Sequence, residues 1–158
     1  MYKRNYNFLN FKGRSKENGE WVFGTPIKTD SGEIVIIDSG LNRTPIRRET
    51  LCQKTNSVDR NFNPVYEGDL VVTEQGLLKK NQIIGCARFG EEPGYLDSTV
   101  NVWKIHWTEP MRFQTTNYEI IGNVYDDKFQ DDGFLKENWP DDWQRIKHFV
   151  EKEENEEE

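Results

Sequence analysis

Few residues of this chain combine a reactive side chain with a spacing that chemistry requires. Glu67 and Asp69 flank Gly68, and residues two apart on a strand share one face of a sheet. A carboxylate pair can act as general acid and base, but the neighbouring sequence offers no nucleophile or base partner. Glycine permits a positive φ, and aspartate can accept hydrogen bonds from its own turn. We therefore predict that Tyr66, Glu67, Gly68 and Asp69 form a structural turn, with Tyr66 buried.

The cysteines and histidines are too scattered to form a recognisable site. Cys52 and Cys86 lie far apart in the sequence, as do His106 and His148, and their spacing makes no metal-binding pattern. Cys52 could pair with a distant histidine, but no helix N-terminus is expected beside it to activate the thiol. Phosphate-binding loops, dinucleotide fingerprints and Gly-x-Ser-x-Gly motifs are missing from the sequence. We expect free thiols, no catalytic residue, no cofactor and no metal, and hence a protein that is not an enzyme.

One group of basic residues could contact nucleic acid. Its members are Arg43, Arg47, Arg48, Lys79 and Lys80. Basic residues in loops are more commonly just solvated. The net charge of −7 resides in residues 125–158, because the acidic and basic residues of 1–124 almost balance. A neutral body argues against a protein that wraps a long nucleic acid by neutralising its phosphates, but it is compatible with a small basic patch.

The first 125 residues read as short strands separated by turn-forming residues. The runs are rich in aromatic and β-branched side chains, and Gly, Asn, Asp and Ser bound them. The expected strands are residues 20–24, 33–38, 69–73, 82–89, 99–107 and 118–125. Short strands at this spacing are typical of a small barrel or sandwich. No helical periodicity competes before Tyr125, so an all-β or β-dominated fold is predicted.

The character of the sequence changes after Tyr125. Residues 126–133 look like a polar linker, and Pro140 followed by two aspartates is typical of a helix N-terminus. Apolar residues then recur at helical spacing, which predicts an amphipathic helix of about three turns. The apolar face comprises Trp143, Ile146, Phe149 and Val150. Trp139, which lies just before the helix, is grouped with Trp143, Ile146 and Phe149 as a possible partner-binding surface. We expect this face to pack on the chain's own barrel, or alternatively to dock on another protein or a second copy, while residues 153–158 remain disordered.

The sequence also bears on the compartment. The first residues lead into no apolar stretch of the kind that signal peptides contain, and apolar runs such as 70–72 are far too short to cross a bilayer. Secreted disulfide scaffolds are much richer in cysteine than this chain. We therefore expect a cytoplasmic protein that makes no membrane contact.

Three stretches resemble the YopX family of bacteriophage and prophage proteins. They are Trp21-Val22-Phe23-Gly24, the region from Glu49 through Asp59-Arg60-Asn61 to Val65-Tyr66-Glu67-Gly68-Asp69-Leu70-Val71, and Glu119-Ile120-Ile121-Gly122-Asn123-Val124-Tyr125. The resemblance implies an SH3-like small barrel with an added N-terminal strand region, in a bacterial host. It implies no activity. On this view residues 1–125 form a YopX-like β domain, and residues 126–158 add the acidic linker, short C-terminal helix and acidic tail.

These observations lead to one functional hypothesis and one alternative. The hypothesis is a phage- or prophage-encoded, non-enzymatic accessory protein that acts as a protein-interaction module. Its partner would be a host or phage protein, or a second copy of the chain. The alternative is a weak nucleic-acid-binding β-barrel, because small barrels often serve that use.

Overall fold

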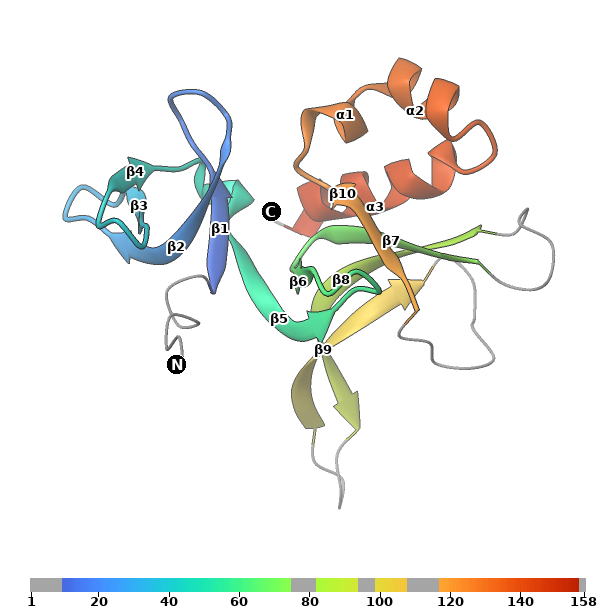
Figure 1. Cartoon of the computed structure of the whole chain (residues 1–158), viewed down its shortest axis with the longest axis horizontal. Helices are drawn as coiled ribbons and strands as arrows, with labels where there is room; N and C mark the ends of the chain where they lie inside the picture. Colours follow the sequence, from blue (N-terminus) through green and yellow to red (C-terminus); the bar gives the residue numbers. More distant parts are fainter. Residues whose placement is uncertain (1–9, 75–81, 94–98, 108–116, 157–158) are drawn as a thin grey trace. The chain divides into compact units, whose positions relative to one another are not determined.

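The chain forms two compact units, Met1–Thr55 and Asn56–Glu158, in a computed structural model (Figure 1). The structure describes residues 10–74, 82–93, 99–107 and 117–156. The sequence analysis places a boundary near Tyr125 instead. In the structure the segment after Tyr125 belongs to the second unit, together with the strands from Asn56 onward.

The first unit is built on an antiparallel sheet. Its strands are β1 (Phe11–Arg14), β2 (Trp21–Lys28), β3 (Ile34–Ile37), β4 (Arg43–Pro45) and the first part of β5 (Cys52–Val58), and a 3-10 turn, η2, covers Arg48–Thr50. The order is β4-β3-β2-β1-β5, so three consecutive hairpins build most of the sheet. Ile36 and Ile46 are almost completely buried and form the apolar interior of this unit.

The second unit contains a separate four-stranded sheet. Its strands are β7 (Asp69–Glu74), β8 (Gln82–Pro93), β9 (Thr99–Trp107) and β10 (Glu119–Asn123), in the order β10-β7-β8-β9 with every neighbour antiparallel. The short strand β6 (Pro64–Tyr66) pairs with β5, as the last strand of the sheet that contains β1 to β5. The β-dominated fold is confirmed, and the described residues before Tyr125 contain no α-helix.

The expected SH3-like barrel is wrong in one respect, because the two sheets are open and neither closes on itself. Closure would bury the faces of a small sheet against each other. The second unit instead covers one face of its sheet with helices, which is a different way to remove the same apolar surface from water. Figure 1 shows the helices on one side of β7 and β8.

Three helices form this cover, where the sequence predicts a linker and one helix. They are α1 (Asp127–Gln130), α2 (Asp132–Asn138) and α3 (Trp143–Glu156). The side chain of Asp131 caps α2 by accepting hydrogen bonds from the backbone N–H groups of Gly133 and Phe134. The predicted start of the last helix agrees with α3, which continues into the acidic run as far as Glu156. No helix in the described ranges is long and apolar enough to cross a membrane.

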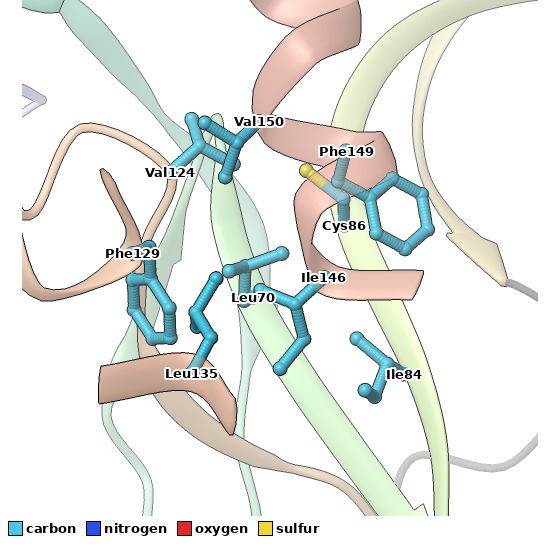
Figure 2. Close-up of a cluster of buried hydrophobic side chains, with 9 residues drawn as sticks. All are labelled: Leu70, Ile84, Cys86, Val124, Phe129, Leu135, Ile146, Phe149 and Val150. Atoms are coloured by element: carbon cyan, nitrogen blue, oxygen red, sulfur yellow. The ribbon is translucent and has the colours of Figure 1, made fainter. Parts of the chain in front are cut away.

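The strands β7 and β8 are buried on both faces. Leu70 and Cys86 point to the helices, where Phe129, Leu135, Ile146, Phe149 and Val150 meet them (Figure 2). Their chain neighbours, Val71 and Ala87, lie on the opposite face with Val65 and Tyr118. This alternation follows from the two-residue period of a strand. The core on the helical face therefore depends on residues that come after Tyr125.

Replacing Ile146 with alanine tests whether α3 belongs to this core. Ile146 has no exposed surface, so we expect the free energy of unfolding to fall by about 2–5 kcal/mol, the usual loss for a large buried aliphatic residue. Urea unfolding followed by circular dichroism measures the change. Gln144, which is exposed on the same helix, gives the matched control Gln144→Ala, with an expected change within about 0.5 kcal/mol. Equal stability of the two variants would contradict the packing of α3 on the sheet.

Candidate functional site

The motif from Tyr66 to Asp69 forms a buried turn. Tyr66 is 4% exposed and Asp69 is 2% exposed, and Gly68 has a φ of 80°, which favours glycine. Asp69 Oδ2 accepts a hydrogen bond from the backbone N–H of Tyr66 at 2.8 Å. Burial, with a smaller effect of the Asp69 charge, raises the pKa of Tyr66 above its ordinary value. This is the geometry of the structural turn that the sequence indicates.

Asn123 joins this turn to the end of β10. Its Nδ2 donates to Asp69 Oδ1 at 2.9 Å and to the carbonyl of Glu67 at 3.0 Å. Its Oδ1 accepts from the backbone N–H of Tyr125 at 3.1 Å. Asn123 is 1% exposed, so no ligand in solvent reaches this network without displacing part of the core. The network therefore ties the turn before β7 to the end of β10 inside the core.

The four apolar residues around the last helix face the chain's own core. Ile146 is fully buried and Phe149 is 5% exposed, while Trp139 and Trp143 pack against the same cluster. The ring of Trp139 lies 5.8 Å from that of Phe129, centroid to centroid. The second unit thus uses the surface that could otherwise have docked on a partner.

The thiols are equally enclosed. Cys52 and Cys86 are both free and buried. Cys86 pairs in register with His106 across β8 and β9, but Cys86 has no exposed surface and lies among apolar side chains (Figure 2). His148 is exposed on α3. A buried cysteine of this kind has no access to a substrate.

The three arginines of the predicted basic group, which all lie in the first unit, are exposed. Arg43 lies on β4, and Arg47 and Arg48 lie at η2, so all three side chains are open to solvent. Lys79 and Lys80 lie outside the described residues. Of the predicted basic group, the structure therefore describes only the three arginines.

The first unit contains a groove of about 480 Å³ that the sequence analysis did not predict. The β1–β2 turn, the start of β2 and the β3–β4 turn form its walls. The lining residues are Ser15, Glu17, Asn18, Glu20, Trp21, Val22, Phe23, Asp38, Ser39 and Thr44. Polar side chains outnumber apolar ones, and three of the polar side chains are carboxylates. The groove thus combines an aromatic wall with acidic charge.

Hydrogen bonds within each turn fix the acidic walls. In the first turn the backbone N–H of Ser15 donates to the carbonyl of Glu20 at 2.8 Å, and Asn18 Oδ1 accepts from the backbone N–H of Glu20 at 3.0 Å. In the second turn Asp38 Oδ1 accepts from the backbone N–H groups of Gly40 and Asn42, at 2.9 and 3.0 Å. The bond from Asn42 is the main reason why the pKa of Asp38 lies below its ordinary value. Asp38 therefore stays ionised at neutral pH.

The aromatic wall is accessible from solvent. Phe23 is 41% exposed, which is high for a phenylalanine on an interior strand of a sheet. Trp21 is half-buried, and the ammonium group of Lys12 lies 4.5 Å from the centre of its ring. Within the described ranges, no group of His, Cys, Asp or Glu side chains is placed to hold a metal ion. The groove can therefore offer an apolar surface and negative charge to a ligand.

The sequence predicts the strand that carries the aromatic wall, but it does not show that this strand and the two turns line one groove. The expected strand at residues 20–24 overlaps β2, which begins at Trp21. Asp38 and Ser39 come from the next hairpin, and their approach depends on how β2, β3 and β4 pair. The sequence contains one indication of this groove, because Phe23 is an aromatic residue close to the acidic turn with Glu17 and Glu20.

The comparisons agree with the fold and the motifs. The family model described as YopX protein matches residues 6–128 of the chain. This range contains the Trp21–Gly24 strand, the Tyr66–Asp69 turn and the Gly122–Tyr125 turn. The chain belongs to the YopX family. The match covers every strand from β1 to β10 and ends within α1. No curated protein and no solved structure matches the chain.

Replacing Asp69 with alanine tests the structural role of the buried turn. The change leaves two buried donors, Tyr66 N–H and Asn123 Nδ2, without their carboxylate. One buried unsatisfied donor costs about 1–3 kcal/mol, so we expect a loss of stability at or above that range. Urea unfolding measures it, with the exposed Asp30 as the control in Asp30→Ala. An Asp69→Ala protein of unchanged stability would show that the turn does not hold the fold.

Proposed function

We propose that this YopX-family chain is a non-enzymatic accessory protein of a phage or prophage, and that it binds a protein partner through the groove of its first unit. The observation that carries the proposal is the groove itself, with an exposed Phe23 beside three carboxylates. The origin in a phage or prophage rests on the resemblance of the three motifs to YopX proteins.

The chemistry of the groove supports a protein partner over a small apolar molecule. Small-molecule pockets are mostly lined by hydrophobic side chains with a few placed polar groups, whereas the lining here is mainly polar. Protein interfaces combine an aromatic anchor with a polar rim, and aromatic residues dominate their binding energy. Phe23 and Trp21 would be the anchors, and the turns on either side would be the rim.

A second candidate function, weak nucleic-acid binding, is favoured by the three exposed arginines. Three arginines neutralise few phosphates, so they would support only weak binding that is sensitive to salt. Titration of labelled DNA and RNA at several salt concentrations tests this alternative. Binding that falls steeply with salt and is lost in an Arg43→Ala, Arg47→Ala, Arg48→Ala variant would support it.

Replacing Phe23 with alanine tests the proposed function. Immobilised full-length protein would capture partners from a bacterial lysate, and the affinity of each captured protein would then be measured by calorimetry. We expect Phe23→Ala to weaken the partner's binding at least about 10-fold, the effect of losing an interface anchor of 1.4 kcal/mol or more.

The control for this experiment is Ile27→Ala. Ile27 is 45% exposed, lies on the same strand and does not line the groove. This variant should retain the affinity of the unchanged protein, and thermal melts should show that both variants fold. A partner that binds both variants equally well would place the interface elsewhere and contradict the proposal.

A further inference from the structure

Two turns of the chain have the same hydrogen-bond pattern. Residues 38–42 join β3 to β4, and residues 59–63 join β5 to β6. Each turn begins with an aspartate whose Oδ1 accepts from the backbone N–H groups two and four residues later, at 2.9 and 3.0 Å for Asp38 and at 2.9 Å in both cases for Asp59. The backbone N–H of the aspartate donates to the carbonyl of the fifth residue, and its carbonyl accepts from the N–H of the fourth. Both turns are therefore held in one conformation.

The fourth residue of each turn presents a large apolar side chain to solvent. Leu41 is 77% exposed and Phe62 is 84% exposed. Their φ angles are 62° and 64°, and they are the only residues other than glycine with a positive φ among those that the structure describes. This conformation is unfavourable for a residue with a Cβ, whereas glycine adopts it freely. Stability explains neither the φ nor the exposure of Phe62, and backbone outliers of this kind cluster at functional sites.

The charged side chains of the Phe62 turn, which comprises residues 59–63, are already paired. Arg60 pairs with Glu119, while Asp59 is 3% exposed and accepts hydrogen bonds from backbone N–H groups. The chain as a whole has a net charge of −7. Phosphates and anionic lipid headgroups bind to available cations, so they match this turn poorly. An apolar wall on a protein matches it better, because the ring is the part of the turn that is left in water.

The groove of the first unit provides an aromatic wall of this kind. Residues 21–23 of β2 line it, and the ring of Phe23 is accessible from solvent. The carboxylates of the groove have cations on the same walls, because the Lys12 ammonium lies over the Trp21 ring and Arg14 Nε donates to a carbonyl of the acidic turn. The aromatic surface is therefore what the groove offers most readily to a neutral, apolar group.

We infer that the groove binds the Phe62 turn of a second copy of the chain, so that the Phe62 ring packs on Phe23. This inference rests on the proposed function and names the protein partner. Aromatic rings attract each other in edge-to-face and offset arrangements, and a hollow of about 480 Å³ is large enough for one ring and the atoms that adjoin it. Asn61 and Asn63 flank the ring, and their amide groups suit the polar rim of the groove.

The contact is small, which sets its expected strength. An aromatic side chain buries about 150–250 Å², well below the roughly 1,200 Å² at which standard interfaces begin. We therefore expect weak self-association, with a dissociation constant on the order of 0.1–1 mM. Because the contact is apolar and both copies are negatively charged, sodium chloride should leave the affinity unchanged or raise it.

Sedimentation equilibrium of the full-length chain, from about 0.02 to 1 mM, tests this inference. We expect the weight-average mass to rise with concentration. Phe62→Gly should raise the dissociation constant at least about 10-fold, and its melting temperature should be no lower, because glycine adopts the positive φ freely. The matched control is Phe89→Ala, which removes another exposed aromatic ring of the second unit and should associate as the unchanged chain does.

Mixing two variants tests whether the turn enters the groove. Phe62→Gly keeps the groove and Phe23→Ala keeps the turn, so each variant alone should remain mostly monomeric and an equimolar mixture should form 1:1 dimers. The inference is overturned by a chain that stays monomeric at the highest concentration, by association that falls steeply with salt, by a Phe23→Ala chain that associates normally, or by a mixture that behaves as its separate components.

Failure of the inference and failure of the proposed function give different results. A monomeric chain that captures another protein through Phe23 would overturn the inference and leave the function standing. If the binding of neither a second copy nor a captured protein depends on Phe23, both are overturned.

Discussion

The hydrogen bond between Asp69 and Asn123 organises the second unit. Asp69 begins β7, Asn123 ends β10, and the two residues are partners in the register of these neighbouring strands. Both side chains are almost fully buried, where an unpaired carboxylate would be costly, and the bond between them is 2.9 Å long. The same pair also binds the backbone of Tyr66, Glu67 and Tyr125. These hydrogen bonds therefore hold the turn before β7 and the turn after β10 together.

The path of the chain into the helices follows from this arrangement. The backbone N–H of Asn123 donates to Asp126 Oδ2 at 2.9 Å, which directs the chain toward α1. Gly122 has a φ of 150°, and a Cβ there would lie 2.4 Å from the ring of Phe129. Phe129 can consequently pack directly on β10 and join the core that α2 and α3 complete. The strands β7 and β8 of the second unit are buried on both faces, and the groove that we propose for binding lies in the first unit.

Sequence patterns predicted the local features and missed those that depend on pairing. The β-dominated fold, the buried Tyr66 and the start of α3 follow from alternation, turn chemistry and helical spacing, which are local. Open sheets in place of a barrel depend on which strands pair, and periodicity does not encode that choice. The helix α1 has only four residues, too few to show a period, and Phe129 looked like an isolated apolar residue in a linker. The groove could not be predicted from the sequence, because its acidic walls, at Glu17 and Asp38, belong to different hairpins.

A double-mutant cycle between Asp69 and Asn123 tests most directly whether the family motifs form one structural network. The free energy of unfolding would be measured for the unchanged chain, for Asp69→Ala, for Asn123→Ala and for the double variant. Residues in one buried hydrogen-bond network usually show a coupling energy of about 0.5–3 kcal/mol, and we predict a value in the upper half of that range. Losses that add to within about 0.3 kcal/mol, the behaviour of independent sites, would contradict the account.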